Sequence, residues 1–125
     1  MQIRRWARAA AKTEQPVYQY YFSREPRSRQ REFLGAFHAA EIPYAFGILD
    51  QVPNSSMYED WDYELGENMF RFWLDFAKGD FDKYAGEWPT FEPGNEVYLE
   101  FGDKISLGEN LLKDRWGVLE ELLTP

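Results

Sequence analysis

PVYQYYF, residues 16–22, is the stretch of the chain that decides the fold. Its β-branched and aromatic side chains favour a strand, and apolar residues would face both sides of that strand. Strands of this kind are typical of parallel sheets that are covered on both faces. Such a strand needs neighbours for its N–H and C=O groups, and no second strand in the chain has the same central character. The sequence therefore predicts part of a larger α/β domain.

Two amphipathic helices are expected near the ends of the chain. The first covers residues 3–12 and carries one apolar stripe, which consists of Ile3, Trp6, Ala7 and Ala10. The last begins near Asn110, a residue that suits a helix cap. Its apolar stripe consists of Leu112, Trp116, Leu119 and Leu123.

A longer helix is predicted over residues 58–77. Its apolar side chains recur at three- and four-residue intervals and are Trp61, Leu65, Met69, Phe72, Trp73 and Phe76. We interpret this stripe as core packing rather than as a substrate pocket. Ser55 or Ser56 is expected to cap the helix, and Gly79 is expected to end it.

Two further segments complete the expected order of elements. EWPTFEP, residues 87–93, is interpreted as a fixed loop around Trp88 and Pro89 without a chemical role. VYLEF at 97–101 and KISL at 104–107 flank Gly102-Asp103 and predict a short hairpin.

Composition excludes several classes of protein. Aromatic residues make up 18% of the 125 residues, and this much apolar surface needs a core. The chain has no cysteine, which excludes disulfides, thiolate metal sites and a thiol nucleophile. No apolar run is long enough for a membrane-spanning helix. We predict no cofactor.

Charge is unevenly distributed within the total of −8. Residues 1–32 carry eight Lys or Arg against three Glu, whereas residues 33–125 carry six against nineteen Asp or Glu. We interpret the N-terminal arginines as a solvated helix face and a polar loop. The acidic remainder would repel phosphates, so nucleic acid is not an expected partner.

GAFHAAEIPYAFG, residues 35–47, contains His38, the only histidine of the chain. From the residues alone, an imidazole between Phe37 and Ala39 is more often a packed core group than a catalytic one. Pro43 prevents a helix from running through the stretch, so we expect a short turn near His38.

Several stretches match one family in series. They are PVYQYYFSR (16–24), GAFHAAEIPYAFG (35–47), FWLDFAKGD (72–80), EWPTFEP (87–93) and YLEFGD (98–103). In this order they resemble the C-terminal end of the type B carboxylesterases, α/β-hydrolases that include the cholinesterases and bacterial p-nitrobenzyl esterases. The resemblance extends from about Arg4 to Leu122.

The resemblance implies a role for the histidine. In the family, the last parallel strand leads into a loop that carries the catalytic histidine, and these match residues 17–22 and His38. Imidazole has an ordinary pKa of about 6.5, so it can take a proton from a serine and return it to the leaving alcohol. The triad acid precedes the histidine in α/β-hydrolases, so Glu41 is not that acid. The family match implies that Glu41 orients the histidine loop; the alternative is an ordinary surface carboxylate.

The nucleophile and the oxyanion hole have no match in this sequence. None of the five serines lies in Gly-x-Ser-x-Gly, and no Gly-Gly motif is present. We therefore expect the serine and the triad acid before residue 1. Residues 1–125 would then be the C-terminal part of a single carboxylesterase domain, which requires the upstream part of the same fold to act on a small carboxylic ester. The chain alone is predicted to be inactive.

Two alternatives remain open at this point. Carboxylesterase-like folds also serve as non-catalytic binding or adhesion modules. A small metal-dependent hydrolase is disfavoured because one histidine and no cysteine offer few ligands for a catalytic zinc ion.

Overall fold

The computed structural model describes residues 2–13, 15–26, 35–53 and 55–113. In chain order, the described elements are α1 (Gln2–Ala10), β1 (Tyr20–Phe22), α3 (Ile42–Ala45), the 3-10 helix η1 (Ser55–Met57), α4 (Asp60–Ala77), the 3-10 helix η2 (Asp82–Tyr84), β2 (Val97–Phe101) and β3 (Ile105–Glu109). The predicted helix after Asn110 falls mainly on residues 114–125, which lie outside the described residues.

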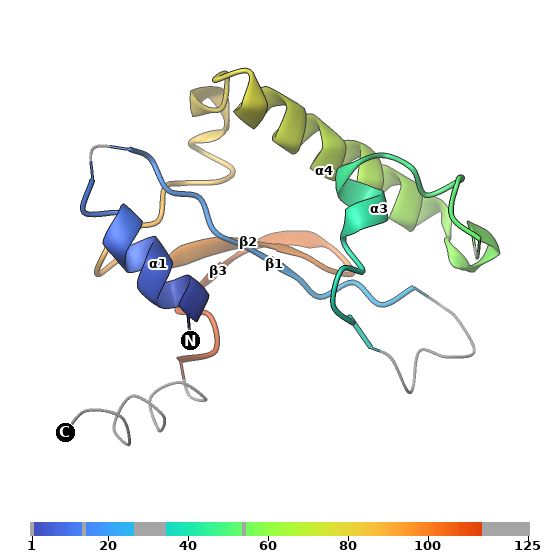
Figure 1. Cartoon of the computed structure of the whole chain (residues 1–125), viewed down its shortest axis with the longest axis horizontal. Coiled ribbons are helices and arrows are strands. Elements are labelled where there is room, and N and C mark those ends of the chain that lie inside the picture. Colours follow the sequence, from blue (N-terminus) through green and yellow to red (C-terminus); the bar gives the residue numbers. More distant parts are fainter. Residues whose placement is uncertain (1, 14, 27–34, 54, 114–125) are drawn as a thin grey trace.

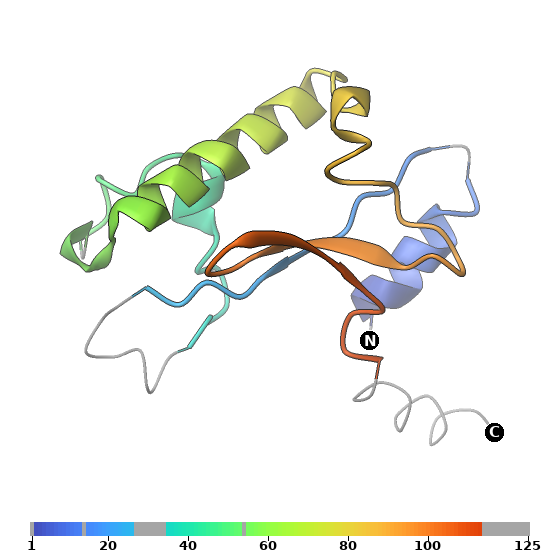
Figure 2. The same ribbon diagram turned by 180° about the vertical axis from the view of Figure 1, so that it is seen from behind.

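The three strands form one mixed sheet in the order β1-β2-β3. β2 and β3 are antiparallel, with Val97 opposite Glu109 and Phe101 opposite Ile105, so the predicted hairpin is confirmed. β1 runs parallel to β2, with Tyr20 opposite Leu99. Figures 1 and 2 show α4 and α1 on opposite sides of this sheet.

The expectation of a buried strand at residues 16–22 is wrong for the described structure. Only three of these residues form β1, and the side chains of Tyr20 and Tyr21 are 38% and 36% exposed. The physical reason is that β1 lies at an edge of the sheet. No strand among the described residues pairs with the edge of β1 that faces away from β2.

The core lies between the sheet and α4. Leu65, Met69 and Phe72 of the helix are buried against Leu99 and Phe101 of β2. Burial of side chains of this size stabilises a fold by roughly 1.5–3 kcal/mol each. The predicted core stripe is therefore confirmed at these three helix positions. Its last member, Phe76, is 57% exposed because it lies in the final turn of the helix.

The start of α4 differs from the prediction. Ser55 forms part of η1 rather than the helix cap, and Glu59 takes the cap position. The backbone N–H of Glu59 donates to Oδ2 of Asp62 over 2.9 Å, as in a capping box. Gly79, with φ of 74°, follows the end of the helix as predicted.

The loop at residues 87–93 is fixed to the strand segment as expected. Trp88 is buried, and its indole N–H donates to the backbone oxygen of Gln19 over 3.0 Å. The backbone N–H of Phe91 donates to the oxygen of Val17 over 2.7 Å. This loop therefore continues the hydrogen bonding of the extended segment before β1.

Two ion pairs join α1 to the residue that precedes β2. Nε of Arg4 and Nε of Arg8 each lie 2.5 Å from a carboxylate oxygen of Glu96, just before β2. Burial raises the pKa of Glu96, but the bonds from both arginines outweigh it and hold the pKa below its ordinary value. These two arginines are therefore ion-paired rather than part of a solvated face. The apolar stripe of the same helix stays open, with Ile3 69% and Trp6 68% exposed.

Candidate functional site

His38 lies in a tight turn that directly precedes α3. Two backbone bonds define the turn: Ala40 N–H to the oxygen of Phe37 at 3.1 Å, and Ile42 N–H to the oxygen of Ala39 at 3.2 Å. The His38 side chain is exposed. It is therefore not the packed core imidazole that its apolar neighbours favour.

The residue after the histidine has an unusual backbone conformation. Ala39 has φ of 68°, in the left-handed region where a Cβ atom approaches the following carbonyl. This conformation costs a non-glycine residue roughly 1–2 kcal/mol. Strained residues of this kind cluster at functional sites, where the surrounding structure maintains them.

The short helix α3 begins directly after the turn. The backbone oxygen of Glu41 accepts bonds from Ala45 N–H at 2.9 Å and Tyr44 N–H at 3.1 Å. Pro43 lies in the first helical turn, where its missing N–H has no intrahelical partner to lose. Pro43 thus permits a helix that starts at Ile42, while it prevents one that arrives from His38.

Close packing joins α3 to α4. Tyr44 and Ala45 are buried against the long helix. A Cβ atom on Gly66 would lie 2.9 Å from Cδ1 of Leu49 and 3.8 Å from Cα of Tyr44. Glycine at this position of α4 is what allows the histidine-bearing segment to approach the helix.

A buried carboxylate at the start of α4 connects the surrounding elements. Asp62 has no exposed surface. Arg24 donates to it through Nε at 2.7 Å and through Nη2 at 3.0 Å, in a two-point contact. The Tyr44 hydroxyl donates to Oδ1 of Asp62 at 2.7 Å, and the Glu59 N–H donates to Oδ2.

The arginine also reaches the hairpin. Nη1 of Arg24 donates to Oδ1 of Asp103 at 2.6 Å, in the turn between β2 and β3, and Nη2 lies 3.3 Å from Oε2 of Glu59. We call Arg24, Tyr44, Glu59, Asp62 and Asp103 the Asp62 cluster. It joins the segment after β1, the helix α3, the start of α4 and the hairpin turn.

Electrostatics within the Asp62 cluster favour the charged pair. Burial raises the pKa of Asp62, but the bonds from Arg24, Glu59 and Tyr44 outweigh it, and the pKa lies below its ordinary value. The hydrogen bond to Asp62 raises the pKa of Arg24. Burial and the same carboxylate raise the pKa of Tyr44, so its hydroxyl remains a donor. The described residues leave no buried side-chain nitrogen or oxygen unpaired.

Glu41 lies apart from this cluster, on the side of β1 that faces α1. It lines a groove of about 480 Å³ with Trp6, Ala10 and Tyr21 among other residues of α1 and the strand segment. Burial and the charge of Glu41 together raise the pKa of Tyr20. Within the described part of the chain, no hydrogen bond joins Glu41 to His38. The structure therefore brings the two predicted site residues into one turn, without a hydrogen bond between their described side chains.

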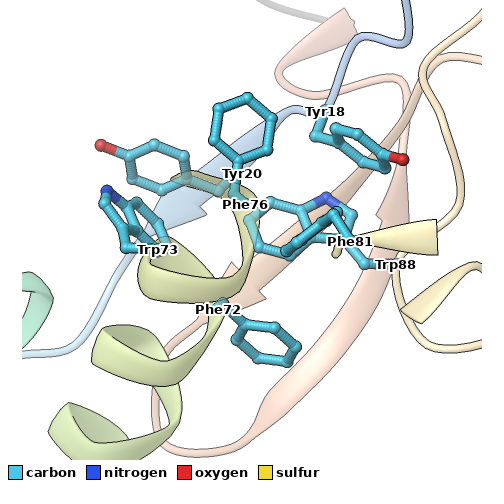
Figure 3. A pocket seen from close by; sticks show the side chains of 7 residues that line it. All are labelled: Tyr18, Tyr20, Phe72, Trp73, Phe76, Phe81 and Trp88. Atoms are coloured by element: carbon cyan, nitrogen blue, oxygen red, sulfur yellow. The ribbon is translucent and has the colours of Figure 1, made fainter. Parts of the chain in front are cut away.

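A second cavity lies between the strand segment and the end of α4 and is about 190 Å³ in volume. Figure 3 shows its lining of seven aromatic side chains, namely Tyr18, Tyr20, Phe72, Trp73, Phe76, Phe81 and Trp88. The rings contact one another edge-on, with Tyr18 and Phe81 centroids 4.5 Å apart. The described lining includes no carboxylate, imidazole, amine or aliphatic hydroxyl group. We therefore interpret the cavity as an extension of the core.

The described residues offer few other functional groups. Residues 2–13, 15–26, 35–53 and 55–113 contain no group of three or more His, Cys, Asp or Glu that could hold a metal ion. Across the same ranges, no helix has the length and apolar character to cross a membrane. No serine in these ranges donates a hydrogen bond to His38.

The comparison with family models identifies the chain. The model of the carboxylesterase family matches residues 1–118. The chain belongs to the carboxylesterase family. The resemblance inferred from the sequence is thereby confirmed.

Curated relatives agree with this assignment. The chain is 30% identical over 95 residues to the para-nitrobenzyl esterase of Bacillus subtilis (strain 168). This alignment covers 74% of the chain and 19% of that protein. It is also 30% identical over 95 residues to the acetylcholinesterase of Bungarus fasciatus. This alignment covers 72% of the chain and 15% of that enzyme. The chain thus spans less than a fifth of the length of these two carboxylesterase relatives.

Solved structures establish the fold. A PNB esterase superposes with a TM-score of 0.74 at 24% identity, covering 91% of this chain and 23% of that chain. A thermophilic PNB esterase gives a TM-score of 0.75 at 24% identity, covering 91% and 24%. The carboxylesterase chain is therefore a part of an α/β-hydrolase domain, as its sequence predicts.

The Asp62 cluster was not foreseen from the sequence. Two signals were available: Arg24 lies two residues after an apolar strand, and Asp62 is the third residue after the Glu59 cap. Neither signal specifies a partner, because Arg24 and Asp62 are far apart in the chain. Only the fold brings them together.

Proposed function

We propose that this chain supplies the histidine-bearing segment of a serine carboxylesterase that hydrolyses small carboxylic esters. The observation that carries the proposal is the environment of His38. A carboxylesterase family member presents its single imidazole on an exposed, strained turn, and the described side chains leave that imidazole without an ion pair. A free ring of this kind is available for proton transfer.

The reaction would use His38 as general acid and base. Its imidazole takes the hydroxyl proton of a serine as that serine attacks the ester carbonyl, and then returns the proton to the leaving alcohol. Water repeats the sequence on the acyl-enzyme. An imidazole has one nitrogen that accepts a proton and one that donates it, so the same side chain serves both steps.

The serine, the triad acid and the oxyanion hole would come from the remainder of the domain. We infer that residues 1–125 form its C-terminal part, since the histidine follows the other triad members in α/β-hydrolases. The open edge of β1 supports this arrangement. A further parallel strand there would satisfy the groups that β1 leaves unpaired in the described structure.

Glu41 is proposed to orient the turn that carries His38. The Glu41 residue is half-buried beside β1. Its backbone oxygen accepts the first hydrogen bonds of α3. The backbone bonds from Tyr44 and Ala45 to Glu41 attach the turn to α3 and so restrain where the imidazole points. It is not the triad acid, which precedes the histidine in this family.

A hybrid enzyme tests the proposal. Residues 1–125 would replace the aligned segment of the Bacillus subtilis para-nitrobenzyl esterase, with p-nitrophenyl acetate as substrate. We expect turnover by the hybrid and its loss in the His38→Ala hybrid. A folded hybrid that turns over substrate equally with and without His38 would contradict the proposed role.

The isolated chain gives the complementary result. Purified 1–125 is expected to show no hydrolysis above background, because removal of the nucleophile forfeits most of the catalysis of a triad. Turnover that depends on His38 in the isolated chain would overturn this expectation. The two relatives reported above are both named as esterases, which does not favour the non-catalytic binding alternative.

A further inference from the structure

We propose that the Asp62 cluster is a positioning device that fixes the segment carrying His38 relative to the sheet; this inference rests on the proposed function of His38. The residues concerned are Arg24, Tyr44 and Asp62. None of them touches the reacting atoms. They act by holding α3, which follows the histidine directly, against α4 and the hairpin turn.

The cluster holds both ends of that segment. Arg24 precedes His38 in the chain and Tyr44 follows it, and both donate to Oδ1 of Asp62 at 2.7 Å. Asp62 in turn belongs to α4, which packs on the sheet through Leu65 and Phe72. The described residues on the two sides of His38 therefore share one buried anchor.

The chemistry of the contacts suits orientation more than stability. An apolar cluster of the same volume often stabilises a fold as well as a buried ion pair does. Apolar contacts have little direction, however, whereas the two-point contact of Arg24 and the hydroxyl bond of Tyr44 each fix an angle. Displacement of a catalytic group by about 1 Å can cost on the order of a hundredfold in rate.

The same helix provides a matched control. At the far end of α4, the hydroxyl of Tyr84 donates to Oδ2 of Asp75, also at 2.7 Å. Tyr84 is buried like Tyr44, but η2, to which it belongs, carries no histidine. Tyr44→Phe and Tyr84→Phe therefore each remove one tyrosine–aspartate hydrogen bond. Only the bond of Tyr44 lies beside the segment that carries His38.

NMR of the 125-residue chain gives the first test. Because His38 is the only histidine, its Hδ2 and Hε1 signals report on this segment alone. We expect Tyr44→Phe to shift, split or broaden these signals, and Tyr84→Phe to leave them at the wild-type position and width. Unchanged signals in Tyr44→Phe, or equal changes in both variants, would overturn the proposal. This readout requires no catalysis.

Kinetics of the hybrid enzyme give the second test. We expect Tyr44→Phe to lower kcat by about tenfold with little change in KM, since a misplaced base affects the chemical step. Tyr84→Phe should change kcat less than twofold at comparable thermal stability. Equal kcat losses in the two variants would indicate a structural role alone. An inactive wild-type hybrid would count against the proposed function, and the NMR result would still decide on positioning.

Discussion

The hydroxyl of Tyr44 and Nε of Arg24 donate to the same oxygen of Asp62, each over 2.7 Å. The two donors belong to opposite ends of the segment that contains His38. One fully buried carboxylate thus connects a strand end, a short helix and a long helix. This arrangement makes the stability of the fold and the placement of the imidazole depend on the same few atoms.

Removal of Asp62 should be the most destabilising single change in the cluster. Asp62→Ala removes the two-point partner of the buried Arg24 guanidinium, which then keeps only Asp103 and Glu59 among the described residues. Breaking a buried ion pair typically costs about 3–5 kcal/mol, so we expect a loss near the lower end of this range. The double variant Arg24→Met with Asp62→Leu removes both charges and should recover part of that loss, since the Tyr44 hydroxyl still lacks its acceptor. Urea unfolding followed by tryptophan fluorescence measures all three proteins. A double variant no more stable than Asp62→Ala would contradict the expectation.

Acid should destabilise the chain through Asp62 and Glu96. Both carboxyls have a pKa below the ordinary value, so the unfolded state binds protons that the folded state does not. Their contribution is present above the unfolded pKa values of about 4 and is lost as pH falls through the lower folded values. Urea midpoints between pH 7 and pH 3 should fall with pH, and more steeply in wild type than in Glu96→Gln. Parallel curves for the two proteins would show that Glu96 keeps an ordinary pKa.

Local pattern predicted the elements well but not their connections. The spacing of Leu65, Met69 and Phe72 specified both a helix and its buried face, because three- and four-residue intervals suit little else. The burial of the strand was predicted from the composition of residues 16–22, yet burial depends on neighbours that composition cannot supply. For the same reason, the partners of Arg24 and Asp62 could not be predicted. The strain at Ala39 also escaped prediction, since alanine carries no sequence signal for positive φ.

The turn after His38 should respond to glycine in a position-specific way. Ala39→Gly removes the Cβ contact that positive φ creates, roughly 1–2 kcal/mol, against an entropy cost of roughly 0.5–1 kcal/mol. We expect a neutral to slightly stabilising change. Ala40→Gly, at a neighbouring residue without positive φ, should destabilise, and Ala39→Val should destabilise further. Thermal unfolding compares the three; a destabilising Ala39→Gly equal to Ala40→Gly would show that the turn is not left-handed in solution.

The open groove between α1 and β1 should make the isolated chain self-associate. Ile3 and Trp6 are more than two-thirds exposed beside a strand edge that no described strand covers, and such edges favour pairing between molecules. Trp6→Gln should therefore reduce concentration-dependent association, measured by analytical ultracentrifugation. Leu107→Gln is the matched control, because Leu107 is an exposed apolar residue of β3 at the other end of the sheet. A larger reduction in the Leu107 variant would show that the molecules associate through β3 instead. A wild-type chain that stays monomeric at high concentration would contradict the prediction.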